Sequence, residues 1–330
     1  MTPADVDRRA GYRSAAAYRM IDTGGGPETE RGREAATVTV RQIGGDGEAT
    51  GTAPTLWAIS DLHIAYPENR QIVADLAAPA PQDWLIVAGD VAETIADVRW
   101  ALATLRERFA EVIWSPGNHE LWTTAHDPVQ LRGVERYAHL VDLCRSLDVR
   151  TPEDPYLIWS GAGGPAAVAP LFTLYDYSFL PPGTGTKAEG LAYAHRTGIV
   201  CTDEAMLHPD PFPTREQWCW QRLAETEERL AEVGPQLPTV LINHYPLVRT
   251  PMDVLHYPEF AMWCGTDRTA DWHLRYRAAV MVYGHLHIPR TTVYDGVRFE
   301  EVSVGYPREW RRRLAVPGQL RRILPGPQPG

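Results

Sequence analysis

The stretch that decides the fold is LWAISDLH, at residues 56–63. It begins as a short apolar run and ends in two polar side chains, Asp61 and His63. Four further runs follow the same plan, since each is apolar and then stops at turn residues next to a possible metal ligand. Apolar runs of this length, bounded by turn residues, are typical of buried strands. The four runs are WLIVAGD at 84–90, VIWSPGNHE at 112–120, VLINH at 240–244 and VMVYGHLH at 280–287.

Amphipathic segments between these runs predict helices. Thr94 is a candidate N-cap with Asp97 three residues later, and apolar residues then recur at helical spacing. A second helix is predicted over residues 131–147. A third begins after Thr214, where Gln217 would complete a capping box. The apolar stripe of the third helix is expected to contain Trp220, Leu223 and Leu230.

The alternation of strands and helices determines the expected fold class. It predicts a largely parallel sheet covered by helices. Asp295-Gly296 lies between two alternating runs, which is a strong signal for an antiparallel two-residue hairpin. We therefore expect an α/β sandwich with mixed β-sheets flanked by helices.

The two ends of the chain differ from its middle in composition. Residues 1–52 are rich in glycine, alanine, threonine and charge, which predicts a disordered extension. Residues 311–330 contain five arginines and end in PGPQPG, which predicts an exposed basic tail. The expected catalytic domain spans residues 53–310. It would carry an insertion at about 121–238, whose Pro- and Gly-rich part, about 180–213, would face the substrate.

Composition and charge exclude several classes of protein. The net charge is −10, from 32 Lys plus Arg against 42 Asp plus Glu, which argues against non-specific affinity for nucleic acid or anionic membranes. A phosphate substrate remains compatible with this charge, because bound metal ions reverse the local sign. No apolar run approaches the roughly 18–20 residues of a membrane span, and the N-terminus lacks the apolar core of a signal peptide, so a cytoplasmic protein is expected. The four cysteines form no CxxC pair and are expected to be buried free thiols.

The polar residues that end the apolar runs are of types that bind transition metals. In open α/β sheets ligands bind at the carboxyl ends of strands, so five separate segments would bring their side chains to one place. Imidazole and carboxylate together suit Mn, Fe and Zn. The carboxylate of Asp90 has two oxygens and could bridge two cations. The candidate residues are Asp61, His63, Asp90, Asn118, His119, Glu120, His244, His285 and His287.

These five motifs, in this order, resemble those of the calcineurin-like metallophosphoesterase superfamily, in particular its stand-alone bacterial members. The resemblance covers about residues 55–306. The family's second motif often reads Gly-Asp-x-x-Asp, whereas this chain has Glu93 at the last position, which is usually not a metal ligand. The resemblance implies one metal held by Asp61, His63, Asp90 and His287, and another held by Asp90, Asn118, His244 and His285.

The resemblance also implies a mechanism with two divalent or trivalent ions of Mn, Fe or Zn. A hydroxide that bridges the ions would attack phosphorus in line with the leaving oxygen. Asp90 would be the only protein ligand shared between the ions. His119 would donate a hydrogen bond to the phosphoryl group or protonate the leaving group. Glu120 would orient its neighbours rather than bind metal.

Candidate substrate contacts lie outside these motifs. Asp176 and Asp203 occur in loop-prone sequence and could touch the substrate, with a solvated carboxylate as the alternative for each. Arg249 and Tyr257 follow the His244 motif closely, where a substrate phosphate or ring could lie. Three tryptophans are expected to pack in the core rather than to stack on a ligand: Trp218, Trp220 and Trp263.

Two hydrolytic functions are compatible with this site. The first is a phosphomonoesterase that acts on a small soluble metabolite. The alternative is a phosphodiesterase, for example of cyclic nucleotides. A protein phosphatase has no feature in its favour, and an inactive scaffold would show eroded ligands, whereas every ligand position here is intact. A nuclease is disfavoured by the acidic charge and by the lack of a basic aromatic strip.

Overall fold

The computed structural model describes residues 53–313 and 318–326, so the extension expected at residues 1–52 lies outside the described part. One sheet has four strands in the order β10-β1-β2-β3. Its first three strands in the sequence are parallel, and β10 pairs with β1 in the antiparallel direction. The strands are β1 (Leu56–Ile59), β2 (Trp84–Val87), β3 (Glu111–Trp114) and β10 (Arg321–Leu324).

A second sheet has six strands in the order β4-β5-β6-β7-β9-β8. The four central strands are parallel, and the edge strands β4 and β8 are antiparallel to their neighbours. The predicted hairpin joins β8 to β9, and both Asp295 (φ 50°) and Gly296 (φ 79°) have the positive φ that such a turn requires. The strands are β4 (Leu157–Trp159), β5 (Ala166–Pro170), β6 (Thr239–Ile242), β7 (Ala278–Tyr283), β8 (Arg290–Tyr294) and β9 (Val297–Glu301).

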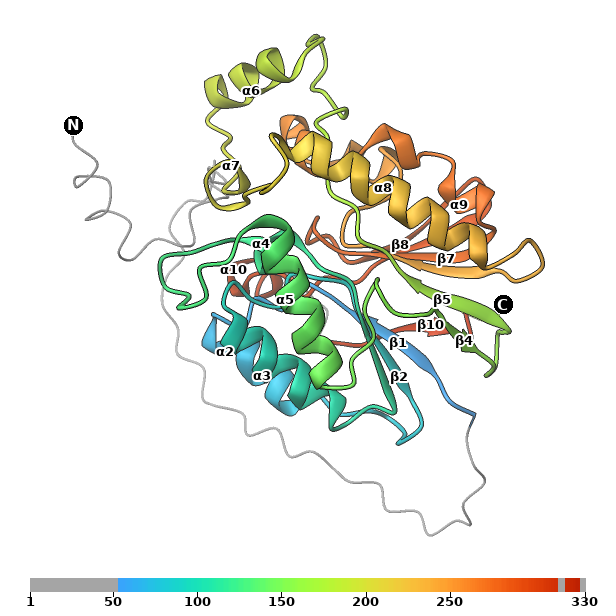
Figure 1. The fold of residues 1–330 in the computed structure, drawn as a ribbon. Helices are drawn as coiled ribbons and strands as arrows, with labels where there is room; N and C mark the ends of the chain where they lie inside the picture. Colours follow the sequence, from blue (N-terminus) through green and yellow to red (C-terminus); the bar gives the residue numbers. More distant parts are fainter. Residues whose placement is uncertain (1–52, 314–317, 327–330) are drawn as a thin grey trace, which may run out of the picture. The chain divides into compact units, whose positions relative to one another are not determined.

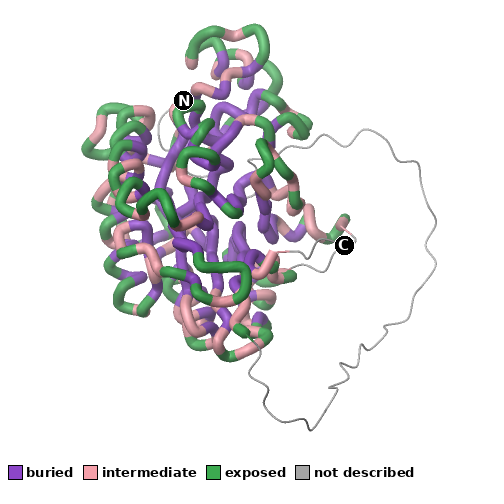
Figure 2. Tube along the Cα trace, turned by 90° about the vertical axis from the view of Figure 1, so that its right-hand side faces the viewer, coloured by how far each residue is buried: buried purple, intermediate pink, exposed green. Residues whose placement is uncertain are grey.

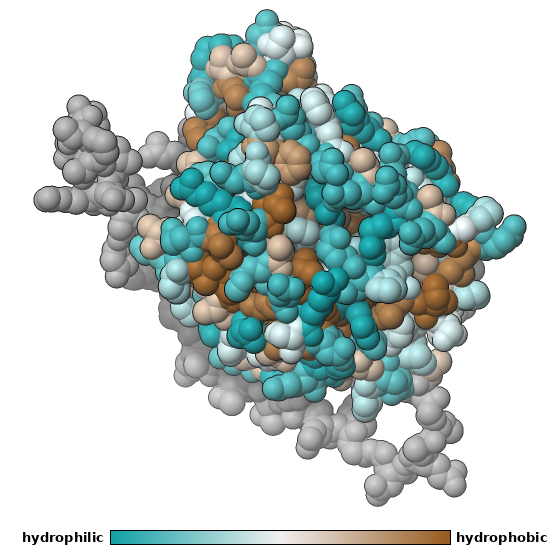
Figure 3. Space-filling view, in the orientation of Figure 1, coloured by the Kyte–Doolittle hydropathy of each residue, from teal (hydrophilic) through white to brown (hydrophobic). Residues whose placement is uncertain are grey.

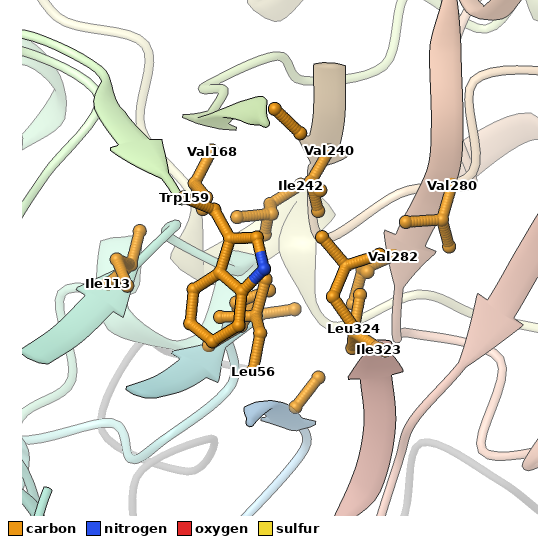
Figure 4. Packing of buried hydrophobic residues seen from close by; sticks show 14 of the residues in the cluster. Leu56, Ile113, Trp159, Val168, Val240, Ile242, Val280, Val282, Ile323 and Leu324 are labelled. Carbon is orange, nitrogen blue, oxygen red and sulfur yellow. The ribbon is translucent and has the colours of Figure 1, made fainter. Parts of the chain in front are cut away.

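The two sheets bury a common apolar core between them (Figure 4). One sheet contributes alternate residues such as Leu56, Ala58 and Ile86, and the other contributes Val240 and Val282. Alternation is expected because successive side chains of a strand point to opposite faces. Figure 2 shows buried residues in the interior and exposed residues mainly at the periphery. The four cysteines are buried free thiols, as predicted.

Helices cover the outer face of each sheet, so the predicted α/β sandwich with mixed sheets is confirmed (Figure 1). The N-caps of α3 and α8 are those predicted, because Thr94 accepts a hydrogen bond from the amide of Asp97, and Thr214 accepts one from that of Gln217. One face carries α2 (Pro67–Asp75), α3 (Ile95–Arg106) and α5 (Gly133–Ser146), and the other carries α8 (Arg215–Glu232) and α9 (Trp272–Arg275). The remaining helices are α4 (Asn118–Leu121), α6 (Lys187–Arg196), α7 (Asp203–Met206), α10 (Pro307–Trp310), and the 3-10 helices η1 (Thr250–Val254), η2 (Pro258–Trp263) and η3 (Asp267–Thr269).

The structure corrects two expectations about chain organisation. Residues 311–330 are not simply an exposed tail, because Arg321–Leu324 forms β10, with Ile323 and Leu324 buried in the core. Burial of these two apolar side chains stabilises the strand, while Arg321 is half-buried beside Glu300 and Arg322 stays exposed. Much of the predicted insertion at 121–238 belongs to the sandwich, since β5 pairs with β6 and α5 packs against α3.

The buried face of α8 also differs from the predicted stripe. Trp220 is 41% exposed, while Trp218 and Trp263 are buried as predicted. Polar residues occupy part of the buried face, because the guanidinium of Arg222 lies 4.7 Å from the centre of the Phe172 ring and forms an ion pair with a glutamate. Among the described residues no helix is long and apolar enough to cross a membrane. Hydrophilic side chains cover much of the face in Figure 3, with smaller hydrophobic patches between them.

Candidate metal centre

The predicted ligands follow the carboxyl ends of five parallel strands, and the structure brings all of them together. Asp61 and His63 come after β1, and Asp90 comes after β2. Asn118 is the first residue of α4, just after β3. Because parallel strands end at the same edge of a sheet, and the two sheets are packed together, side chains far apart in the sequence meet here. The ligands that follow the second sheet's strands are His244, after β6, and His285 and His287, after β7.

Five of these residues have a backbone conformation that L-amino acids seldom adopt. The φ angles are 53° for Asp61, 42° for His63, 54° for Asp90, 69° for His285 and 55° for His287. A non-glycine residue in this region costs on the order of 1–3 kcal/mol, and such residues cluster at functional sites. In each case the chain turns sharply just beyond a strand, and the turn directs the side chain to the common centre.

Glycines at the strand ends allow the carboxylates to come close to the backbone. A Cβ on Gly117 would lie 2.1 Å from Oδ1 of Asp90, and one on Gly284 would lie 2.2 Å from Oδ2 of Asp61. Both separations are far below a van der Waals contact, so no larger residue fits without displacing a carboxylate. Gly89 also has φ of +85° and faces the backbone of Gly117. The glycines at these turns are therefore required by the site itself.

The first cluster consists of side chains that follow β1, β2 and β7. Nε2 of His287 lies 3.0 Å from Oδ1 of Asp61 and 3.1 Å from Nε2 of His63. Oδ2 of Asp90 lies 3.9 Å from Nε2 of His63. The Nδ1 atom of His287 lies 2.8 Å from the Glu309 carboxylate. Each nitrogen of the His287 ring thus faces a carboxylate, which can only accept a hydrogen bond, and Nε2 is the nitrogen that would give up its hydrogen to bind a cation.

The second cluster is centred on His244. Its Nε2 atom lies 3.2 Å from Oδ1 of Asn118, 3.2 Å from Nδ1 of His285 and 3.3 Å from Oδ2 of Asp90. Its Nδ1 atom donates to the carbonyl of Ala88 at 2.9 Å, so in the neutral ring Nε2 is an acceptor. Oδ2 of Asp90 thus lies next to histidines of both clusters.

The orientation of Asn118 is fixed by a buried carboxylate. Nδ2 of Asn118 donates to Oδ1 of Asp203 at 2.9 Å, and Nε1 of Trp122 donates to the same oxygen at 2.7 Å. Because the amide nitrogen faces Asp203, the amide oxygen of Asn118 faces the second cluster. Asp203 is fully buried, so it supports a predicted ligand from behind rather than facing solvent.

The donor set of both clusters fits cations. Each cluster brings carboxylate oxygens and imidazole lone pairs within 4.8 Å of one another. Burial lowers the pKa of both His63 and His285 to about 3, so these rings are neutral at pH 7 and able to bind metal. The Asp90 carboxylate outweighs burial and raises the pKa of His244 to about 9, and the carboxylates of Glu309 and Asp61 likewise raise the pKa of His287, so a cation would displace a proton from each of these two rings. Imidazole with carboxylate and an amide oxygen suits Mn, Fe or Zn.

His119 lies at the edge of the clusters in a position suited to proton transfer. Its ring packs against Trp122 at 3.7 Å between centroids, and its Nδ1 atom lies 2.9 Å from Oε1 of Glu93. Its Nε2 atom lies 3.8 Å from Oδ2 of Asp90. Burial alone would lower the pKa of His119, but the carboxylates of Asp90 and Glu93 outweigh burial and raise it above the usual value.

Glu120 connects the ends of β2 and β3. Its Oε2 atom accepts hydrogen bonds from the amides of Asp90 at 3.0 Å and Gly117 at 3.1 Å. Its Oε1 atom accepts from the amide of Val91 at 3.1 Å and from Nε1 of Trp114 at 3.3 Å. Glu120 therefore fixes the loop that carries Asp90 and is itself directed away from the clusters.

The other predicted substrate residues have partners of their own. Asp176 is half-buried and accepts hydrogen bonds from Trp220, Thr266 and the amide of Ser178. Arg249 donates to the carbonyl of Leu180 and lies 5.9 Å from the Phe179 ring centre. Tyr257 is half-buried and precedes η2. A role of these three residues in substrate binding stays a prediction.

Sequence reasoning missed several residues that support the ligands. Oγ of Ser303 donates to Oδ2 of Asp61 at 2.7 Å, the ring of Tyr306 stacks on His63 at 4.5 Å, and Glu309 accepts from His287. No local pattern marks these three residues. Glu93 did carry a signal, because it occupies the last position of the second motif, but its contact with His119 needs the fold to be seen.

Comparisons with known proteins agree with this geometry. Residues 54–289 match the family described as calcineurin-like phosphoesterase. The chain is 58% identical over 285 residues to a Mycobacterium tuberculosis protein named [acyl-carrier-protein] phosphodiesterase PptH, which covers 86% of this chain and 88% of that protein. The crystal structure of phosphopantetheinyl hydrolase PptH from Mycobacterium tuberculosis superimposes with a TM-score of 0.83 at 58% identity, covering 85% of this chain and 100% of that one.

Proposed function

We propose that this chain is a dinuclear phosphodiesterase that releases phosphopantetheine from acyl carrier protein. The chain belongs to the calcineurin-like phosphoesterase family and is a metal-dependent hydrolase of phosphoric esters. The observation that carries the choice of substrate is 58% identity, over most of both chains, to a relative whose name states that activity. The donor groups of both clusters are present, which supports metal-dependent hydrolysis of a phosphoric ester.

Similarity to this relative changes the proposed substrate from a phosphomonoester to a phosphodiester. The sequence alone favours a monoester of a small soluble metabolite, with a diester as the alternative. A relative named as a phosphodiesterase supports the diester alternative, and it replaces a small molecule by a protein-bound ester as the proposed substrate. A cyclic nucleotide has no such support.

The two clusters would each hold one cation, with Asp90 shared. Asp61, His63 and His287 would complete the first set, and Asn118, His244 and His285 the second. Two cations held there would neutralise the charge of the phosphoryl oxygens and make water a stronger nucleophile. Mn, Fe and Zn are the ions that suit these donors.

His119 would supply the proton for the leaving group. In its protonated form Nδ1 donates to Glu93, and Nε2 carries the second hydrogen towards the reacting ester. As the P–O bond breaks, this hydrogen passes to the leaving oxygen, and the ring remains neutral with its other hydrogen on Nδ1. An alkoxide is a poor leaving group, so this proton matters for a phosphodiester of a protein side chain. Trp122 packs against the ring and keeps it in place.

The test is hydrolysis of acyl carrier protein that carries phosphopantetheine, followed by intact-mass spectrometry of the carrier protein. With the Mn²⁺-loaded enzyme, the carrier protein should lose the mass of phosphopantetheine. With the Asp90→Ala variant, the mass of the carrier protein should not change. Bis-p-nitrophenyl phosphate and p-nitrophenyl phosphate serve as generic diester and monoester. Hydrolysis of both p-nitrophenyl esters with no action on the carrier protein would contradict the proposed substrate but keep the reaction class.

A further inference from the structure

The segment of residues 305–313 lies beyond the stretch matched by the family, yet it touches the metal centre. The family match ends at residue 289. Glu309, on α10, accepts a hydrogen bond from Nδ1 of His287 at 2.8 Å and another from the amide of Tyr306 at 2.9 Å. A carboxylate behind a histidine ligand fixes the ring and makes its other nitrogen a better donor to metal.

The ring contacts and hydrogen bonds of Gly305, Tyr306, Glu309 and Arg313 with the centre involve residues of the first cluster. The Tyr306 ring stacks on His63 at 4.5 Å and meets the His287 ring edge-on at 4.8 Å. The amide of Gly305 donates to the backbone carbonyl of Asp61 at 3.0 Å. The guanidinium of Arg313 donates to the carbonyl of His287. The three residues that belong only to the first cluster are therefore all held by this one segment.

The segment is itself fixed to the body of the protein by Asn69 of α2. Nδ2 of Asn69 donates to the carbonyls of Leu62 at 2.8 Å and Gly305 at 2.9 Å. Oδ1 of Asn69 accepts from Nε1 of Trp310 at 2.9 Å. Asn69 is 1% exposed, so water does not compete for these bonds. The geometry of the first cluster thus depends on a buried link between α2 and α10.

The second cluster has other supports. His244 donates to the carbonyl of Ala88, and Asn118 is oriented by Asp203. Both supports lie in different parts of the chain from the segment. A change at Glu309 therefore removes a support from one cluster and leaves the supports of the other in place.

We propose that segment 305–313, acting through Glu309, sets the affinity of the first cluster for its cation separately from that of the second cluster. Glu309 is a positioning residue, because it acts on the ion only through His287. The inference rests on the proposed dinuclear function. Loss of a group that orients a ligand typically weakens metal affinity about 10–100-fold.

The experiment measures Mn²⁺ content per chain at graded free Mn²⁺ in Glu309→Gln, which keeps the side-chain volume, and in Glu309→Ala. Electron paramagnetic resonance separates single Mn²⁺ ions from spin-coupled pairs. The expected result is a 10–100-fold weaker affinity at one of the two sites, so that at intermediate Mn²⁺ the variants hold one uncoupled ion while the wild type holds a coupled pair. Arg311→Ala, on an exposed residue of the same segment, should behave as wild type.

A third variant, Asp203→Asn, is the matched change at the other cluster, and combining it with Glu309→Gln should weaken both sites. Thermal unfolding of the metal-free proteins checks that each variant is folded. Two ions bound by the Glu309 variants with wild-type affinity, or a parallel loss of both ions, would overturn the inference. A wild-type chain that binds a single ion would overturn the dinuclear proposal and this inference together, whereas the former outcomes leave the dinuclear proposal intact.

Discussion

Replacement of His119 by alanine tests the proposed general acid more directly than any other change. The side chain removed is 7% exposed, packs on Trp122 and is hydrogen-bonded to Glu93. It is not among the seven predicted metal ligands, so both ions should stay bound in His119→Ala. Its proton is needed only when the leaving oxygen is strongly basic.

The expected loss follows from the value of a positioned acid. General acid help is typically worth about 10²–10⁴-fold in rate, which is about 2.7–5.4 kcal/mol of activation free energy. The loss should be of this size on an alkyl diester or on acyl carrier protein with phosphopantetheine. On bis-p-nitrophenyl phosphate it should be much smaller, because p-nitrophenolate leaves without a proton.

The assay compares kcat for the two classes of diester in Mn²⁺-loaded wild type and His119→Ala, with metal content measured on the same samples. Glu93→Gln is the matched control, because it keeps the imidazole but removes the carboxylate that holds it. An equal loss on both classes would refute the role as an acid and indicate stabilisation of the phosphoryl group instead. Loss of an ion in His119→Ala would show that His119 has a structural role in the centre.

Three further outcomes are expected. Asp90→Ala should weaken the binding of both ions and abolish most activity, and metal analysis that shows one site unaffected would argue against a shared ligand. Glu93→Gln should move the alkaline limb of the pH–rate profile to lower pH. The charge of Glu93 helps to raise the pKa of His119, so without it the protonated form of His119 is lost at lower pH. An alkaline limb that does not move would contradict the pairing of His119 with Glu93. Ile323→Ala should lower the free energy of unfolding, measured in urea, by about 2–5 kcal/mol because this side chain is fully buried. Arg322→Ala, on the exposed side of the same strand, should lower it little. Equal small effects of both changes would mean that β10 does not pack as described.

The strands that carry the ligands were predictable because their signals are local. β1 and β2 begin at the first residue of the apolar runs quoted for them, and β3, β6 and β7 begin one or two residues before theirs. Each is a continuous apolar run, as expected for a strand buried on both faces. The hairpin at Asp295-Gly296 and the N-cap at Thr94 were predictable for the same reason, since both depend on residues within one turn.

Elements whose signal is not local escaped prediction. β10 has only four residues, two of them arginines, and its partner β1 lies about 265 positions earlier in the chain. β5 is Ala-Ala-Val-Ala-Pro, whose small side chains give a weak apolar signal although all five residues are buried. The stripe of α8 was misplaced at Trp220 because the buried face includes Arg222, and a buried arginine is predictable only when its partners are known.

The same division applies to the candidate site. The convergence of the candidate ligands was predictable because each follows its own strand within a few residues, so that the topology of the sheets brings them together. Glu309 and Ser303 could not be found in this way, since their partners His287 and Asp61 lie 22 and 242 positions away. Asp203 was predicted to be near the substrate, but its contact with Asn118 depends on the path of the whole segment between β5 and β6.

Backbone strain and hydrogen bonding at this centre are two parts of one arrangement. A candidate ligand such as Asp90, with φ of 54°, would relax if nothing held it. Its amide donates to Glu120 and its Oδ1 accepts from the amide of His119, while the carboxylate of Asp61 accepts from the amide of His285. The first two bonds join the ends of β2 and β3 within one sheet, and the third joins the end of β7 to the end of β1 in the other sheet, so the strained turns persist only when the sandwich has formed. The donor groups are therefore held close together by the fold itself, which makes the folded chain a receptor for cations.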